Sequence, residues 1–436
     1  MRAYEEYKDS GYDWLGKIPA HWVKTKLREL TKESNERRGQ RQDLELLSVY
    51  RELGVIIKNS RDDNHNSESE DTSNYKYVNK DYLVINKMKL WQGSLGISAF
   101  EGIVSPAYIV CKITKEINTR YLNYLLRSPL FKTYYNRISY GIRVGQWDSD
   151  YDDLKQLDLF LPPREEQDAI VRFLDAKCAK IDRLIKLKER QIELLNEKKQ
   201  NIINQAVTKG LDPHAPMKDS GVDWIGDIPE GWSVNQLKKY IDILPGYAFS
   251  SSDFKKDSGI PLLRGINVAP SHIRWDDVVY WDKAVDDNLS KFLLREGDLV
   301  VGLDRPWIAD GVRISLIKKE DLPCLLLQRV CRIRPKNDIE IQYLFYILGS
   351  DFFKVQLSAD TTGISVPHIS TKQIESFCFA IPPIDKQQEI LAHLEEQRAS
   401  IDSCITKIQN SIDKLIEYKK KLICELVTGK VNLTTN

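Results

Sequence analysis

The sequence predicts an α+β chain with two globular domains and two long helices that form an antiparallel coiled-coil spacer. Three observations support this fold class. Related segments recur in the two halves of the 436 residues, which indicates an internal duplication with pseudo-twofold symmetry. Each half contains a mixed block with short apolar runs typical of strands. Each mixed block is followed by a Pro-Pro pair and a long segment with heptad spacing.

The clearest repeat is a motif near the start of the chain that returns in its middle. Residues 8–22 read KDSGYDWLGKIPAHW, and residues 218–232 read KDSGVDWIGDIPEGW. Other segments return in the same order, so we expect the whole chain to be duplicated. The predicted divisions are an N-terminal repeat motif at 1–22, a first mixed domain at 23–160, a first spacer helix at 161–210, a linker with the second repeat motif at 211–232, a second mixed domain at 233–380, a second spacer helix at 381–430 and a tail at 431–436.

The mixed blocks predict α+β domains with a mixed or antiparallel sheet. The runs YLVIN at Tyr82 and DLVVG at Asp298 are short and apolar, as buried strands are. The segments YLNYLLRSPLFK from Tyr121 and YLFYILGSDFFK from Tyr343 carry apolar residues at helical spacing. Strands followed by helices within one block are typical of the α+β class.

The long helices are predicted to begin after Pro162-Pro163 and Pro382-Pro383, because proline is tolerated at a helix start but not inside one. Apolar residues then recur at alternating steps of four and three, which is a heptad seam. We predict helix–helix packing by Leu174, Ile181, Ile185, Ile192, Leu195, Ile202, Leu394, Ile401, Ile405, Ile408, Ile412, Leu415 and Leu422. The alternative is that each helix lies only on its own domain.

Composition and charge restrict the class of protein. Hydrophobic residues make up 42% and charged residues 29%, which is ordinary for a globular protein. The net charge of +1 neither indicates nor excludes nucleic acid. We expect no membrane association and a cytoplasmic location, because the start has no apolar leader and no run of about 18 apolar residues occurs.

Motifs for catalysis are missing from the sequence. It contains no G-x-x-x-x-G-K-[ST] phosphate loop and no G-x-G-x-x-G, and its six histidines lack metal-ligand spacing. Leu161 and Ile381 precede the Pro-Pro pairs, where adenine methyltransferases use Asn or Asp to hold the target amine. We therefore predict no catalytic residue, no metal site and no cofactor in this chain.

Two segments in each mixed block are candidates for contact with DNA, because Arg and Gln can read base edges and Lys, Thr and Ser suit phosphates. One follows the buried strand and the other precedes the Pro-Pro pair, and the stretch LLRGINV adds a weaker candidate. The predicted DNA-binding residues are Lys87, Lys89, Trp91, Gln92, Tyr140, Arg143, Gln146, Arg264, Asn267, Arg305, Trp307, Thr361, Thr362, Ser365 and His368. The alternative is solvated loop tips, with Trp91 and Trp307 as core aromatics.

Together, the motif DSGxxWxGxIPxxW, the helix start L/I-P-P-x-x-x-Q, the exit V-T-K-G-L-D-P and the two-copy layout resemble the specificity subunit of type I restriction-modification systems. The resemblance covers essentially the whole chain. It implies that each mixed block is a target-recognition domain that reads one half of a split sequence in double-stranded DNA. It also implies that the helices set the gap between the two halves.

The same resemblance implies a non-catalytic subunit with defined partners. Two methyltransferase subunits would dock on it, and restriction/translocase subunits would join through them. S-adenosylmethionine and ATP with Mg would then be held by those partners. Three alternatives stay open: a recognition subunit of a related restriction system, a coiled-coil scaffold without DNA readout, and an enzyme that acts on nucleic acid alone.

Overall fold

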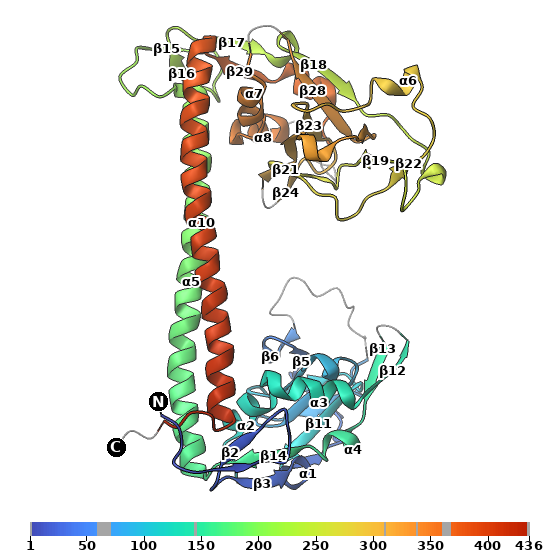
Figure 1. Cartoon of the computed structure of the whole chain (residues 1–436), viewed down its shortest axis with the longest axis vertical. Helices are drawn as coiled ribbons and strands as arrows, with labels where there is room; N and C mark the ends of the chain where they lie inside the picture. The colour runs from blue at the N-terminus through green and yellow to red at the C-terminus, as the bar shows by residue number, and fades with distance from the viewer. Residues whose placement is uncertain are drawn as a thin grey trace. The chain divides into compact units, whose positions relative to one another are not determined.

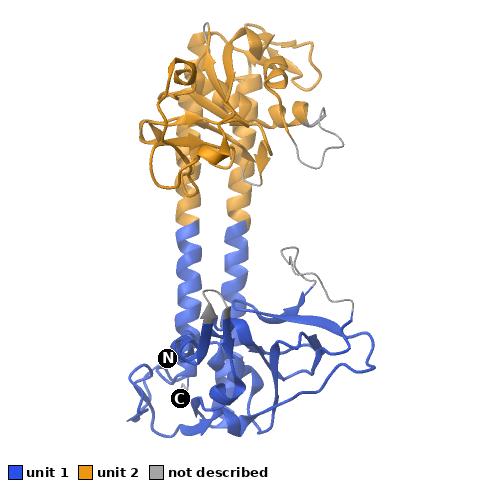
Figure 2. Cartoon of the chain, turned by 90° about the vertical axis from the view of Figure 1, so that its right-hand side faces the viewer, with its two compact units in different colours: residues 1–189, 409–436 blue, residues 190–408 orange. Residues whose placement is uncertain are grey.

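The computed structural model describes residues 2–58, 71–143, 146–308, 311–336, 339–359 and 368–433, without the side chains of 142, 143, 146, 358 and 359. The chain separates into two compact units (Figure 2). Unit 1 contains residues 1–189 and 409–436, and unit 2 contains residues 190–408. Each unit therefore combines one mixed domain with segments of both long helices. No helix in the described ranges is long and apolar enough to cross a membrane.

Unit 1 begins with the first repeat motif, which forms a hairpin, and continues into the first mixed domain (Figure 1). Its elements are β1 (Tyr7–Asp9), β2 (Lys17–Pro19), β3 (Val23–Lys26), α1 (Leu27–Leu30), β4 (Thr31–Glu33), β5 (Glu45–Tyr50), β6 (Gly54–Ile57), β7 (Lys76–Val78), β8 (Leu83–Asn86), η2 (Lys87–Gln92), β9 (Leu95–Ile97), β10 (Gly102–Val104), β11 (Tyr108–Ile113), α2 (Thr119–Leu126), η3 (Pro129–Phe131), α3 (Lys132–Arg137), β12 (Ser139–Arg143), β13 (Gln146–Ser149), α4 (Tyr151–Leu154) and β14 (Asp158–Leu161).

Unit 2 repeats this plan with the second repeat motif and the second mixed domain. Its elements are β15 (Met217–Asp219), β16 (Asp227–Pro229), β17 (Ser233–Gln236), η4 (Leu237–Lys239), β18 (Ile241–Pro245), η5 (Ser251–Asp253), β19 (Ile260–Leu263), β20 (Val268–Ala269), β21 (His272–Ile273), β22 (Tyr280–Trp281), α6 (Asp287–Ser290), β23 (Leu299–Gly302), β24 (Trp307–Ile308), β25 (Gly311–Val312), β26 (Ile314–Leu316), η6 (Lys319–Asp321), β27 (Leu325–Leu326), β28 (Val330–Pro335), α7 (Ile341–Leu348), α8 (Asp351–Ala359), α9 (Thr371–Ser376) and β29 (Cys378–Ile381).

The central sheets of the two domains have matching topology. The order is β4-β11-β8-β9 in unit 1 and β18-β28-β23-β26 in unit 2, and every neighbouring pair is antiparallel. A second sheet in each domain, β6-β5-β10-β7 or β22-β19-β27, contains one parallel pair. The predicted α+β class with an internal duplication is therefore confirmed.

The apolar runs of β8 and β23 are continuous because both faces of these strands are covered. In β8, Leu83 and Ile85 join the core beneath the helices, whereas Val84 faces a separate core formed with the second sheet. Leu299 and Val300 of β23 divide between two cores in the same way. Successive side chains of a strand point to opposite faces of the sheet, which places neighbouring residues in different cores. Each domain therefore has two apolar layers, one on each face of its central sheet.

The long helices α5 (Arg164–Lys209) and α10 (Ile384–Val427) begin directly after the Pro-Pro pairs, as predicted. The hydrogen bonds of the glutamine explain why it follows the proline pair at a fixed distance in each Pro-Pro-x-x-x-Gln motif. The Gln387 amide donates to the Pro382 carbonyl at 3.1 Å and accepts from the Glu340 backbone N–H at 3.0 Å. Gln167 makes the same two hydrogen bonds in unit 1, to Pro162 and Asn118. A buried glutamine thus ties the start of each long helix to the start of α2 or α7.

Within each unit, segments of α5 and α10 pair in antiparallel fashion. The Lys419 ammonium lies 2.6 Å from the Asp182 carboxylate in unit 1, and the Lys199 ammonium lies 2.9 Å from Asp402 in unit 2. All of the predicted packing side chains are buried or half-buried. Leu184, Leu187 and Leu194, which lie off the seam, are about half exposed at 48%, 53% and 48%.

Each repeat motif receives the end of a long helix. Trp232 of the second motif lies against Gly210, which follows α5, and Trp22 of the first motif lies against Gly429, which follows α10. Both glycines have φ near +70°, a conformation that favours glycine after a helix. The motif occurs twice because the end of each long helix packs against the same kind of surface.

We predict that Gln387→Ala lowers the free energy of unfolding of unit 2 by about 1–3 kcal/mol, because the Glu340 N–H and Pro382 carbonyl lose a buried partner. Urea titration measures this change, and hydrogen exchange at the Glu340 amide should accelerate. The matched control is Gln388→Ala, because the Gln388 side chain is exposed and, among the described residues, its hydrogen bond is to the Glu340 side chain at 3.3 Å. Equal effects of the two substitutions would contradict this role of Gln387.

Candidate nucleic-acid interface

In unit 1 the two candidate segments, far apart in sequence, lie against each other. The segment after β8 was predicted to be a loop, but it forms the short 3₁₀ helix η2. Its Lys87 ammonium lies 3.5 Å from the Asp148 carboxylate, and the rings of Trp91 and Trp147 lie 5.7 Å apart. The hairpin β12–β13 supplies Asp148 and Trp147, so the ion pair and the ring contact together hold η2 against that hairpin.

The predicted DNA-binding side chains of unit 1 do not all share one environment. Lys89 is exposed on η2, and Tyr140 is 56% exposed on β12 with its hydroxyl donating to Asp153. Gln92 instead lines a cavity of about 580 Å³ beside α2, α5 and α10. Arg143 and Gln146 face each other as backbone partners at the tip of the hairpin, and their side chains lie outside the described residues.

Unit 2 also brings its two candidate segments together, through a different set of charges. His368 Nδ1 lies 2.6 Å from the Asp304 carboxylate, which also accepts from Arg329 at 3.2 Å. A backbone bridge joins residues 304 and 368. Lys87 directly follows β8 and Asp304 comes two residues after β23, so the two units place opposite charges near the same end of their central strands. Thr361, Thr362 and Ser365 lie outside the described residues.

An arginine cluster, formed by Arg274, Arg305 and Arg313, lies beside this contact. Burial lowers the pKa of Arg313, and the neighbouring charges of Arg274 and Arg305 lower it further. Arg313 remains protonated at neutral pH, since the ordinary pKa of arginine exceeds 12. Like charges held together in this way attract an anion, and a DNA phosphate would relieve their repulsion. Sequence reasoning found Arg305 but missed Arg274, Arg313 and Arg329, because they lie on separate segments.

Two of the surface arginines have strained backbones. Arg305 has φ of 45° and Arg329 has φ of 71°, a region that side-chain-bearing residues rarely adopt. Strain of this kind is concentrated at binding sites. The Arg305 side chain is exposed, and among the described residues it has no hydrogen bond or ion pair. It is therefore available to an external anion.

Asn267 corrects the predicted list. Asn267 is buried, its amide oxygen accepts from the Arg264 N–H at 3.0 Å, and its amide nitrogen donates to the Arg274 and Asp277 carbonyls. It holds a turn and cannot read a base. Trp307 packs against the core of unit 2, as the core-aromatic alternative stated. Arg264 donates to Asp277, so its guanidinium is only partly available.

The described residues include no group of three or more His, Cys, Asp or Glu side chains that could hold a metal ion. The features that they do present are two pairs of joined segments, each with aromatic and charged side chains. Such a surface can contact phosphates and base edges.

The family model of the type I restriction modification DNA specificity domain matches the chain over residues 19–197 and again over 229–417. The two matches cover most of the chain and follow the internal duplication.

Curated relatives point in the same direction. The chain is 31% identical over 366 residues to the type I restriction enzyme MjaVIII specificity subunit of Methanocaldococcus jannaschii, covering 82% of each chain. It is 34% identical over 206 residues to the EcoAI specificity subunit of Escherichia coli, a match that spans 47% of this chain and 34% of that protein.

Solved structures share the fold. A chain from work on complex assembly and conformational transition of the type I R-M system aligns with a TM-score of 0.68 at 16% identity, covering 95% of this chain and 99% of that one. The HsdS subunit from Thermoanaerobacter tengcongensis aligns with a TM-score of 0.50 at 17% identity, covering 97% of this chain and 100% of that one.

We predict that Arg305→Ala weakens binding of duplex DNA and lowers the magnitude of the slope of log K against log salt concentration by about 0.9, as expected for one lost phosphate contact. Fluorescence anisotropy at several salt concentrations measures both changes. The matched control is Arg295→Ala, since Arg295 is an exposed arginine of unit 2 outside the cluster. An unchanged slope for Arg305→Ala would remove this residue from the interface.

Proposed function

From the premise that this chain belongs to the type I restriction-modification DNA specificity family, we propose that it reads a split DNA target, with each recognition domain contacting one half. The family is one of specificity subunits, which are non-catalytic. The chain would act on chromosomal DNA in the cytoplasm.

The observation that carries the proposal is a shared framework with different contact surfaces. Three features recur in both units: the buried glutamine at the start of each long helix, the tryptophan packed against the glycine after each long helix, and the central sheet. The joined segments differ, with Lys87 and Asp148 in unit 1 and Asp304 and His368 in unit 2. A constant framework with variable side chains at one place is suited to reading two different sequences, because side chains at base edges carry the specificity.

The proposed partners are two methyltransferase subunits, joined by restriction/translocase subunits. A duplicated framework supports this, because two copies of one partner need two similar surfaces. S-adenosylmethionine and ATP with Mg would be held by those partners. The paired helices α5 and α10 would set the gap between the half-sites.

A genome-wide methylation map tests the proposed function. Cells that carry this chain with its neighbouring methyltransferase are compared with cells that lack only this chain. We expect a split methylated motif that disappears with the chain. Loss of no motif would contradict DNA recognition, and loss of a continuous motif would contradict two separated half-sites.

Heptad insertion tests whether the helices set the gap. The ion pairs of Asp182 with Lys419 and of Lys199 with Asp402 fit one antiparallel register of α5 and α10, in which residue 193 lies opposite residue 408. Seven residues inserted after both positions keep the seam and lengthen each helix by about 10 Å. At about 3.4 Å per base pair, the gap in the methylated motif should grow by roughly three base pairs.

The control insertion places the seven residues in α5 alone. It breaks the register with α10, so methylation should be lost. Full methylation with an unchanged gap after the double insertion would show that the helices do not set the spacing.

A further inference from the structure

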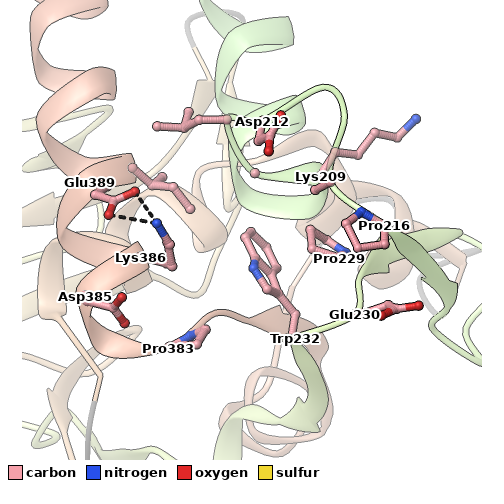
Figure 3. A pocket seen from close by; sticks show the side chains of 15 residues that line it. Lys209, Asp212, Pro216, Pro229, Glu230, Trp232, Pro383, Asp385, Lys386 and Glu389 are labelled. Atoms are coloured by element: carbon pink, nitrogen blue, oxygen red, sulfur yellow. Dashed lines mark hydrogen bonds and ion pairs between the residues drawn. The ribbon is translucent and has the colours of Figure 1, made fainter.

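A cavity of about 540 Å³ lies in unit 2 where α5 ends, the linker turns and α10 begins (Figure 3). Trp232 of the second repeat motif points into it, and Pro216, Pro229 and Pro383 line it. The indole N–H of Trp232 has no hydrogen-bond partner among the residues that the structure describes. The place is therefore an apolar hollow with one unused donor.

The internal duplication supplies a filled counterpart of this cavity in unit 1. There the ring of Tyr4 lies edge-on to Trp22 with centroids 6.3 Å apart, and 5.6 Å from the ring of His21. The Tyr4 hydroxyl donates to the Glu166 carboxylate at 2.5 Å, and the Trp22 indole donates to the same carboxylate at 3.1 Å. Burial and this hydrogen bond raise the pKa of Tyr4 far above its usual range, so the hydroxyl stays protonated.

A backbone bridge between Arg2 and Asn432 holds the segment that carries Tyr4. The Arg2 N–H donates to the Asn432 carbonyl at 3.3 Å, and the Asn432 N–H donates to the Arg2 carbonyl at 2.7 Å. Unit 1 thus has two chain segments at this place, one after α10 and one before β1. Unit 2 has only the linker, residues 210–216, between α5 and β15.

Unit 2 lacks each element of the filling. His214 is the linker's counterpart of Tyr4 and is exposed, Gly231 replaces His21, and Lys386 replaces Glu166. The Lys386 ammonium lies 2.8 Å from Glu389 at the edge of the cavity. The shorter linker cannot supply both segments, which leaves the position of the Tyr4 ring empty.

The edge of the cavity is acidic. Its charged lining groups are four carboxylates and two ammonium groups. They are Asp212, Glu230, Asp385, Glu389, Lys209 and Lys386. An incoming segment with positive charge is favoured at such an edge.

We propose that this cavity receives an aromatic side chain, flanked by Lys or Arg, from an extended segment of the methyltransferase subunit. The identity of the partner rests on the proposed function, whereas the chemistry of the occupant comes from Tyr4 and the acidic edge. The two units then differ in how they bind their partners. In unit 1 the chain's own Tyr4 fills the place beside the repeat-motif tryptophan, whereas in unit 2 that place is open.

The test is to fill the cavity with Gly231→Phe. A Cβ atom on Gly231 meets nothing within 4 Å, and its φ lies outside the region that favours glycine, so the backbone accepts the change. The matched control is Ser233→Phe, which places the same ring at an exposed position that does not line the cavity.

The first probe is the capped peptide Lys-Ala-Tyr-Lys-Lys, measured by calorimetric titration against the full chain. We expect binding to the wild type and to Ser233→Phe, and at least a tenfold weaker Kd with Gly231→Phe or with the Tyr→Ala peptide. Absence of binding to the wild type, or binding that Gly231→Phe leaves unchanged, would overturn the inference.

The second probe is the purified methyltransferase subunit, followed by native mass spectrometry. We expect Gly231→Phe to weaken the binding of one of two copies at least tenfold and Ser233→Phe to weaken neither. Retention of both copies by Gly231→Phe would overturn the assignment of the partner. Failure of the wild type to bind any copy would overturn the proposed function instead, and the peptide result would stand on its own.

Discussion

Neither half of this chain completes a core alone, because each compact unit is closed by the end of a helix that starts in the other half. Leu422, Leu426 and Val427 of α10 belong to the core of unit 1, and Ala206 and Val207 of α5 belong to the core of unit 2. The carbonyls at these helix ends need partners. Tyr121 donates to the Val427 carbonyl, and Tyr343 donates to the Val207 carbonyl.

This exchange of helix ends explains why framework residues recur while the contact segments differ. A substitution at Gln167, Trp22 or Tyr121 would disturb a buried hydrogen bond or a packed ring. Lys87 and Asp304 lie just after β8 and β23, and each makes salt bridges between partly exposed side chains rather than a buried contact. Residues at these positions can be substituted without disturbing the core of either unit, as residues that determine DNA specificity must be.

Sequence reasoning reached the elements whose causes are local. Proline pairs predict helix starts, heptads predict the seam and apolar runs predict β8 and β23, because each pattern reflects one element's own burial. It did not reach features that arise between elements. The η2 helix, the buried role of Asn267 and the grouping of Arg274 with Arg313 all depend on which segments the sheets bring together. The open cavity at Trp232 depends on a linker too short to supply the second chain segment that unit 1 has there.

We expect that recognition domains can be exchanged on a constant framework. The most direct test is to replace residues 23–160 with the same block of a relative. Both ends of the block lie together, because β3 pairs with β14 from Val23 opposite Leu161 to Lys26 opposite Asp158. A methylation map of cells that carry the hybrid should show one half of the motif changed, with the other half and the gap retained. A change in both halves would contradict the separation of framework and reader.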